Sequence, residues 1–260
     1  MAMEKNDTPA DSASRVVRRR DALKTLGVAS GLSVVGVPLF GGSAAAQQQQ
    51  QQIVVEDFEY GGQQLTNRYQ FANGRPGISI TQNVSRSGGQ SLRVQGVDGQ
   101  LFASSLPESP TAGDTFSYWV RATGGADTLN FGYAVSDPNN MYYVKIQYPG
   151  NSIFLYREVS GTKELLGVSN SGFSLQQNRW YRVVVQWGES GSHTVRLLGA
   201  NNNQLTQFSG NDSQYDSGGI GFFAYLASGG TAFYDGVTKL SSNGSDGSNG
   251  NTSGSNAGGR

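Results

Sequence analysis

The stretch Trp180–Trp187, which reads WYRVVVQW, decides the fold of this 260-residue chain. Successive side chains of a β-strand point to opposite faces, so residues two apart share a face. One face of this stretch gathers four large apolar side chains, from Tyr181, Val183, Val185 and Trp187. The alternation predicts a strand that buries this face in a core and leaves Arg182 and Gln186 on the other.

Similar short runs extend on both sides of this stretch, from residue 53 to residue 240. They cover residues 91–94, 115–121, 129–135, 141–148, 153–159, 162–168, 193–198, 219–226 and 232–240. Turn residues separate them, for example Asp137-Pro138-Asn139-Asn140 and Ser160-Gly161. About a dozen strands at a spacing of roughly 8–12 residues, without a sustained helical period, predict an all-β antiparallel two-sheet β-sandwich.

The composition agrees with strands joined by tight turns, because the chain contains 37 glycines, 12 tyrosines and 12 phenylalanines. It contains no cysteine. A disulfide framework, a thiol nucleophile and a cysteine metal cage are therefore excluded. The hydrophobic core alone must hold the domain that we predict over residues 53–240.

Residues 1–46 read as an export signal. A basic head ends at Arg18-Arg19-Arg20, an apolar stretch runs from Leu26 to Phe40, and small residues occupy positions 43–46. These are the three parts of a secretory signal, and the apolar stretch is shorter than the about 20 residues that span a bilayer. Because Arg19-Arg20 and Leu23-Lys24 resemble a twin-arginine signal, we expect export of the folded protein by that pathway to the extracellular space or cell surface.

The segments that flank the domain are polar. Residues 47–52 are all glutamine, and residues 241–260 hold no large apolar side chain. We predict a spacer in the first segment and a disordered tail or linker in the second. Without residues 1–46, 13 Lys and Arg stand against 15 Asp and Glu. No basic stripe is left for a nucleic acid partner, and no second apolar segment predicts a membrane span.

Five pieces of the second half carry a family resemblance. In chain order they are Met141–Lys145, Ile153–Arg157, Asn178–Trp187, Ser217–Phe222 and Phe233–Val237. This order resembles the concanavalin A-like lectin and glucanase superfamily, the laminin-G-like jelly rolls. The resemblance covers about residues 53–240 and implies a two-sheet jelly roll. The resemblance is specific for the fold and does not indicate a function, because enzymes, lectins and spacers of this family would all keep these motifs.

The strand faces turned away from the core offer aromatic rings beside polar side chains. A sugar can stack its apolar face on such a ring while polar groups take its hydroxyls. The predicted ligand-binding residues are Trp119, Arg121, Tyr143, Lys145, Arg182, Gln186 and Tyr225. A concave groove that holds Trp119, Tyr143 and Arg182 together is the geometry expected of a sugar site. The alternative is that these aromatic rings are covered, as in any two-layer sandwich.

Groups suited to catalysis are sparse. His193 is the only histidine, and because it follows a glycine-rich turn we expect it to be solvent-exposed and not to act as a base. Glycosidases of the resembling family carry a Glu-x-Asp-x-x-Glu strand, which is absent here. The nearest cluster is Glu56–Glu59, in which Asp57 and Glu59 would share one face of a strand. We predict no catalytic residue.

The resemblance implies a calcium site more readily than a catalytic one. In similar β-sandwich carbohydrate modules, an acidic first strand meets an aspartate of the last strand and binds a structural Ca²⁺. The corresponding residues here are Asp57, Glu59 and Asp235, which would supply hard oxygen ligands. The alternative is that they are ordinary charges at a sheet edge.

The sequence therefore favours a secreted, non-catalytic, lectin-like domain that binds an extracellular or cell-surface glycan. Two other classes stay open: a polysaccharide-degrading hydrolase or lyase of the same fold (or its accessory module), and a structural or adhesive surface protein. Four sequons of the N-glycosylation pattern, at Asn83, Asn211, Asn243 and Asn251, suggest a glycoprotein.

Overall fold

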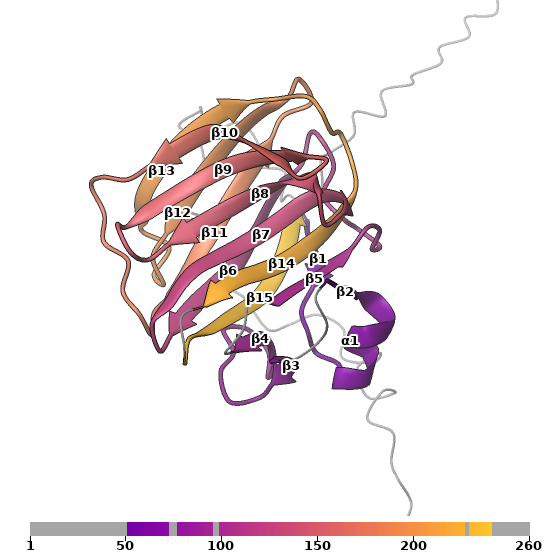
Figure 1. The fold of residues 1–260 in the computed structure, drawn as a ribbon, viewed down its shortest axis with the longest axis vertical. Helices are drawn as coiled ribbons and strands as arrows, with labels where there is room; N and C mark the ends of the chain where they lie inside the picture. Colours follow the sequence, from indigo (N-terminus) through magenta and orange to yellow (C-terminus); the bar gives the residue numbers. More distant parts are fainter. Residues whose placement is uncertain (1–50, 73–76, 96–98, 227–228, 241–260) are drawn as a thin grey trace, which may run out of the picture. The chain divides into compact units, whose positions relative to one another are not determined.

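The computed structural model describes residues 51–72, 77–95, 99–226 and 229–240. They form a sandwich of two antiparallel sheets (Figure 1), as the alternation of the sequence predicts. The predicted signal peptide and tail lie outside the described residues. The first strand begins at Gln52, the last residue of the predicted spacer.

The first sheet, sheet A, has eight strands in the order β13-β12-β11-β6-β15-β4-β3, with β1 also paired to β15. Its strands are β1 (Gln52–Glu56), β3 (Ile78–Thr81), β4 (Ser91–Gln95), β6 (Thr115–Thr123), β11 (Trp180–Trp187), β12 (Ser192–Leu198), β13 (Gln204–Asn211) and β15 (Thr231–Leu240).

The second sheet, sheet B, has seven strands in the order β10-β9-β8-β7-β14-β5-β2. Its strands are β2 (Gln70–Ala72), β5 (Gly99–Ala103), β7 (Ala126–Asp137), β8 (Asn140–Gln147), β9 (Ser152–Val159), β10 (Thr162–Ser169) and β14 (Gly219–Leu226). The described residues also form a helix that the sequence did not reveal, α1 (Gly62–Arg68). Its seven residues bury only Leu65, which is too little to set up a helical period.

The alternating stripes of the two sheets meet in one core, as predicted. The face of β11 that carries Tyr181, Val183, Val185 and Trp187 is buried there. Across the two sheets, the rings of Tyr118 and Phe131 stack with centroids 4.1 Å apart. An aromatic pair of this kind contributes about 0.5–1.5 kcal/mol beyond the apolar area that it buries.

A hydrogen bond of Tyr234 joins the sheets through this core. Tyr234 belongs to β15 of sheet A, and its hydroxyl donates to the Phe223 carbonyl oxygen of sheet B at 2.8 Å. The same hydroxyl accepts from the backbone N–H of Asn130 at 3.1 Å. Phe223 and Asn130 are paired across β14 and β7, so the hydroxyl bridges their backbones and fixes one sheet against the other.

The two glycines at the start of β14, Gly218 just before it and Gly219 as its first residue, are required by close backbone approach, as the motif predicts. A Cβ on Gly219 would lie 1.6 Å from the Ala103 carbonyl oxygen, and one on Gly218 would lie 2.5 Å from the Ala134 carbonyl carbon. No larger side chain fits at these distances. The Ser217–Phe222 motif is therefore explained by the packing of β14 between β5 and β7.

The prediction that His193 is solvent-exposed is wrong, because its side chain is fully buried. Nε2 lies 3.0 Å from the Asp212 carbonyl oxygen, and Nδ1 lies 2.8 Å from the Tyr133 hydroxyl. A carbonyl oxygen can only accept, so Nε2 carries the proton and Nδ1 accepts from the tyrosine. The preceding turn reaches solvent, but alternation along β12 turns this first core-facing residue inward.

Stability should fall on mild acidification through His193. Burial lowers the pKa of this imidazole from its ordinary value near 6.5, although hydrogen bonding to Asp212 opposes the shift. The folded state therefore binds fewer protons than the unfolded state, and stability is lost as the pH falls below about 6.5. Urea unfolding at a series of pH values measures the slope.

The matched variant His193→Gln keeps a polar side chain but does not titrate in this range. We expect it to be less stable than the wild type at pH 8 and to lack the decline between about pH 7 and pH 5.5. An equal decline in the two proteins would contradict the assignment.

Candidate functional site

The predicted ligand-binding residues lie on two different surfaces, so the groove expected to hold Trp119, Tyr143 and Arg182 together does not form. Tyr143, Lys145 and Tyr225 lie on the outer face of sheet B, on β8 and β14. The other four lie on the outer face of sheet A, on β6 and β11: Trp119, Arg121, Arg182 and Gln186. Alternation determines whether a side chain points inward or outward, but it does not say which strands pair in one sheet.

The outer face of sheet B carries a set of aromatic side chains with Lys145 among them, which we call the aromatic face. Its members come from three strands: Tyr143 and Lys145 on β8, Phe154 and Tyr156 on β9, and Phe223 and Tyr225 on β14. Tyr143 and Tyr156 are paired across β8 and β9, and their rings stack with centroids 5.1 Å apart. Phe223 meets Tyr143 edge-on at 5.3 Å.

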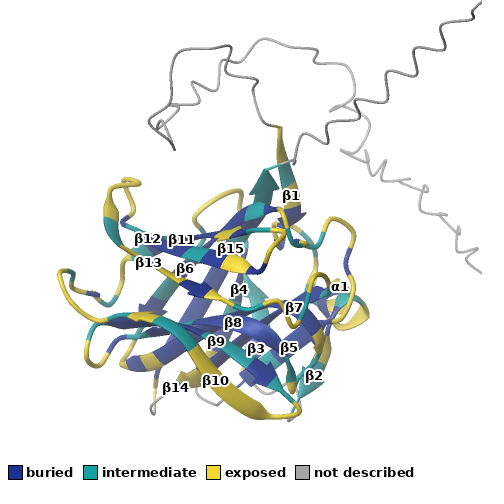
Figure 2. Ribbon diagram, turned by 90° about the horizontal axis from the view of Figure 1, so that it is seen from above, coloured by how far each residue is buried: buried dark blue, intermediate teal, exposed yellow. Residues whose placement is uncertain are grey.

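This face also holds most of the exposed large apolar side chains of the described residues. Tyr225 is 46% exposed, and Leu165 and Val168 on the edge strand β10 are 49% and 40% exposed. Leu165 is paired with Tyr156 and Val168 with Phe154, so both extend the aromatic face outward. The yellow of β10 in Figure 2 shows this exposed edge. A contiguous exposed apolar surface on a folded domain is typical of a binding site.

Three charged groups lie among the rings. The Lys163 ammonium is 4.0 Å from the Glu158 carboxylate and 6.0 Å from the centre of the Tyr143 ring. The Lys145 ammonium is 5.3 Å from the centre of the Phe154 ring. Burial lowers the pKa of Lys145, and the nearby charge of Lys163 lowers it further. Burial raises the pKa of Glu158, while Lys163 opposes the rise. Rings beside a few polar groups can bind a sugar by stacking and hydrogen bonding.

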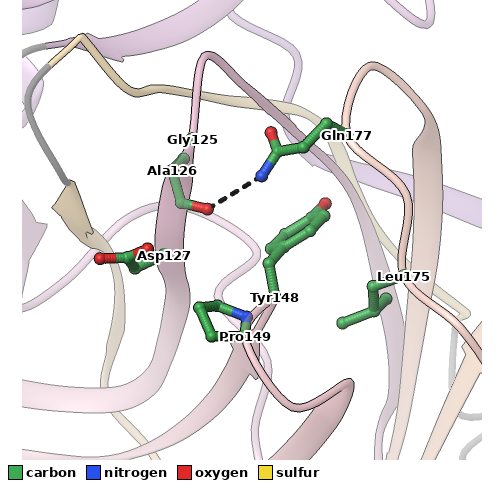
Figure 3. Close-up of a pocket in the computed structure, with 7 residues that line it drawn as sticks. All are labelled: Gly125, Ala126, Asp127, Tyr148, Pro149, Leu175 and Gln177. Carbon is green, nitrogen blue, oxygen red and sulfur yellow. Dashed lines mark hydrogen bonds between the residues drawn. The ribbon is translucent and has the colours of Figure 1, made fainter.

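A pocket opens at the end of the sandwich next to this face (Figure 3). It has a volume of about 290 Å³ and is lined by Gly125, Ala126, Asp127, Tyr148, Pro149, Leu175 and Gln177. Thr128, which follows Asp127 on β7, is paired with Tyr225 of the aromatic face. Asp127 of the pocket wall is therefore one residue along β7 from the partner of Tyr225.

Two polar atoms of the pocket wall are left without a hydrogen-bond partner among the described residues. Gln177 donates from Nε2 to the Ala126 carbonyl oxygen at 3.1 Å, but its Oε1 has no donor. The buried Tyr148 hydroxyl makes no hydrogen bond of standard geometry. Burial raises the pKa of this phenol, so it stays neutral and able to donate. Both atoms have almost no area open to the pocket, so a ligand hydroxyl could reach them only if the pocket wall shifted.

Several residues of the aromatic face and the pocket were not predicted from the sequence, for identifiable reasons. Phe154 and Tyr156 alternate with the core residues Ile153 and Leu155, so the reasoning applied to β8 would have found them. Glu158 lies on the same face of β9. Tyr148 continues the inward alternation of β8, but its place in a pocket depends on Leu175 and Gln177, which are distant in sequence and carry no motif.

The carboxylates proposed as calcium ligands anchor a loop in this structure. Asp235 accepts from the backbone N–H groups of Arg86 and Ser87 and from the Ser87 hydroxyl. Glu59 accepts from the N–H groups of Gly89 and Gln90, and Asp57 from the N–H of Glu59. No group of three or more His, Cys, Asp or Glu side chains in the described part of the chain is arranged to hold a metal ion. The arrangement does not fit a shared calcium site, and calcium binding stays a prediction.

The Glu56–Glu59 segment is also not a continuous strand face. Strand β1 ends at Glu56, and Phe58 adopts a left-handed conformation with φ of 58°. Asp57 and Glu59 therefore do not share a strand face as expected. Glu56 is buried and accepts hydrogen bonds from Tyr60, Arg68 and Tyr69, a structural role at the end of the sandwich.

The substitution Asp235→Asn tests what this carboxylate does. We expect the free energy of unfolding to fall by about 1–3 kcal/mol, because hydrogen bonds to a charged acceptor are lost or weakened. If loop anchoring is the role, the loss is the same in EDTA and in millimolar calcium. A calcium-dependent rise in the melting temperature that the variant lacks would instead establish the predicted metal site.

Comparisons with known proteins support the fold. No protein-family model matches the chain, and no curated protein sequence matches it. Among solved structures, it resembles a mixed linkage glucan GH16 protein of Bacteroides ovatus in complex with its G4G4G3G product. The TM-score is 0.50 at 10% identity, over 71% of this chain and 98% of that one.

Two further structures are similar at lower scores. One is the carbohydrate-binding module CBM66 of Bacillus subtilis, with a TM-score of 0.49, 15% identity, and 67% and 96% coverage of this and that chain. The other is the exoplasmic/lumenal domain of VIP36 in its Ca²⁺/Man3GlcNAc-bound form, with a TM-score of 0.49, 9% identity, and 74% and 89% coverage. The fold of the described residues is a jelly-roll β-sandwich of two antiparallel sheets. None of their helices is long and apolar enough to cross a membrane.

Proposed function

We propose that this protein is a secreted, non-catalytic carbohydrate-binding domain whose glycan lies along the aromatic face. The observation that carries the proposal is the gathering of aromatic side chains from β9, β8 and β14, together with the exposed Tyr225, Leu165 and Val168, on one outer surface of sheet B. The solved structures of similar fold include a carbohydrate-binding module, a glucan-bound GH16 protein and a glycan-bound domain, which supports a glycan-related role.

The chemistry of the face favours binding over turnover. Burial raises the pKa of Glu158, the buried carboxylate of this face, and the charge that opposes the rise is that of Lys163, with no second carboxylate of the described residues acting on it. Glycoside hydrolysis by the common mechanisms needs two carboxyl groups about 5–10 Å apart. The buried histidine is held by Tyr133 and Asp212 inside the core and faces no surface. The runner-up, a hydrolase or lyase of this fold, would use other residues.

The place of action follows from the predicted signal peptide. Export after folding would deliver a domain that needs no disulfide to the extracellular space or cell surface, where glycans are the abundant ligands. A structural or adhesive role would use the same location without a sugar-binding surface. Detection of the mature protein in the culture medium, and its loss when Arg19-Arg20 is changed to Lys-Lys, tests the twin-arginine route.

Replacing Tyr225 with alanine should weaken glycan binding without unfolding the domain. Its side chain is 46% exposed and lies outside the main core. We expect about a tenfold loss of affinity, because a stacked ring contributes roughly 0.5–1.5 kcal/mol beyond its buried area. A panel of soluble polysaccharides identifies the ligand, and calorimetry with that ligand measures the effect.

Val54→Thr is the matched control, since Val54 is 55% exposed on β1 of the other sheet. It should bind as the wild type does. Reducing-end and unsaturated-product assays run in parallel, and release of either product would favour the hydrolase or lyase. Binding that is unchanged in Tyr225→Ala would remove the aromatic face from the proposal.

The variant Tyr148→Phe separates ligand binding from stability in the end pocket. Removing a buried hydroxyl without a standard hydrogen bond should leave the unfolding free energy unchanged or raise it by about 1 kcal/mol. If a sugar hydroxyl uses this group, affinity should fall severalfold in the same protein. A variant that is destabilised and binds normally would show that the hydroxyl has a structural partner.

A further inference from the structure

The outer face of sheet A carries a row of arginines, which we call the arginine face. Arg93 on β4 and Arg121 on β6 are each paired with Phe233 of β15, one on either side of it. Arg182 on β11 is paired with Trp119 of β6, one row further along, and Arg196 on β12 with Val184 of β11, a row beyond. Neighbouring strands lie about 4.8 Å apart, so these cations follow a diagonal across the sheet.

Arg86 adds a fifth cation from the loop above the sheet. Its guanidinium lies 4.3 Å from the centre of the Trp119 ring, and that of Arg182 lies 6.0 Å from the same ring. Burial lowers the pKa of Arg182, and the charges of Arg196 and Arg86 lower it further. Three guanidinium groups are thus close enough to repel one another.

The described residues provide little negative charge to offset this repulsion. Their ion pairs involve Arg68, Arg157, Lys163 and Lys239 as cations, not Arg86, Arg93, Arg121 or Arg182. Asp235 lies on this face but is completely buried. Its carboxylate accepts hydrogen bonds from the backbone N–H groups of Arg86 and Ser87, not from the Arg86 guanidinium.

Donors on the arginine face are also incompletely used. Arg182 donates from Nε and Nη2 to the Ser117 hydroxyl at 3.2 and 2.9 Å, which fixes the plane of its guanidinium. Arg121 has a buried Nε with no acceptor among the described residues. A guanidinium group presents five N–H donors in a planar fork that matches the two oxygens of a carboxylate or sulfate.

We propose that the arginine face binds an acidic polysaccharide, a chain whose repeated carboxylate or sulfate groups pair with Arg93, Arg121 and Arg182. Charge complementarity carries the choice of a polyanion, because Arg93, Arg121 and Arg182 are placed by strand pairing along one face and none of the three is in an ion pair among the described residues. The Trp119 ring beside Arg182 is already in contact with the Arg86 guanidinium, which lies 4.3 Å from its centre. This site is separate from the aromatic face, since the two occupy opposite sides of the sandwich.

The test measures binding of the full-length chain to polygalacturonate, dextran sulfate and neutral dextran at low and high salt. The double variant Arg121→Gln/Arg182→Gln removes two contacts, and Lys163→Gln removes one charge from the opposite face as a control. We expect the wild type to bind at least one of polygalacturonate, which carries carboxylates, and dextran sulfate. The polymer bound with the higher affinity shows which of the two anionic groups the face prefers. Dextran should not bind, and affinity for the polyanion should fall steeply with salt.

The double variant should bind the preferred polyanion at least about tenfold more weakly and with a shallower salt slope, and Lys163→Gln within about twofold of the wild type. The basic residues of the N-terminal segment are identical in all these proteins, so they cannot produce the difference. Circular dichroism melts check that the double variant is folded, and Arg121→Lys/Arg182→Lys, which keeps the charge, should recover part of the affinity.

Equal binding of the polyanions by the wild type and the folded double variant would overturn the proposal, as would absence of binding at low salt. Tighter binding of single-stranded oligothymidylate than of either polysaccharide would reassign the face to phosphate polymers. Tyr225→Ala should leave polyanion binding unchanged, so failure here and failure of the aromatic face are distinguishable.

Discussion

The Tyr234 hydroxyl reaches from sheet A through the core and bridges the backbones of Phe223 and Asn130 in sheet B. Around it, Phe222 packs edge-on against Tyr234 with ring centroids 5.2 Å apart, and Phe131 packs against Phe222 at 5.3 Å. The chain has no cysteine, so no disulfide reinforces this contact. The cross-sheet aromatic packing fixes how the sheets lie on each other, and both outer surfaces depend on it.

One face of each sheet packs in the core, so the outer faces of the two sheets can carry different kinds of side chain. Sheet B turns aromatic rings outward, of which Tyr225 is exposed, and sheet A turns arginines outward around Trp119. A stacked ring suits the apolar face of a sugar, whereas a row of guanidinium groups suits repeated negative charge. The two surfaces together could let one domain contact a glycan on one side and an acidic polymer on the other.

Carboxylates in this domain serve mainly to hold loops and ends. Asp235 and Glu59 bind backbone N–H groups of one loop, residues 86–90, and Glu56 gathers Tyr60, Arg68 and Tyr69 at the end of β1. Such hydrogen bonds to charged acceptors are stronger than neutral ones. These hydrogen bonds explain the acidic residues near the start of the domain by a structural role, without catalysis or metal binding.

The sequence by itself determined most of the strands, their buried faces and the class of fold, but it did not reveal β2, β3, β5 and β13. The alternation in Trp180–Trp187 placed Tyr181 and Trp187 inside and Arg182 outside, because side-chain direction along a strand is a local property. It did not determine which outward residues are neighbours. Only the pairing of β6 with β11 and of β8 with β14 through β7 assigned Trp119 and Tyr143 to opposite surfaces. The inward direction of His193 follows from the same alternation, since Val195 and Leu197 share its face of β12, but the contacts of Tyr133 and Asp212 that enclose the ring join distant parts of the chain. Strand order and long-range enclosure depend on the packing of the whole chain, and so the tertiary structure alone decided where a ligand could bind.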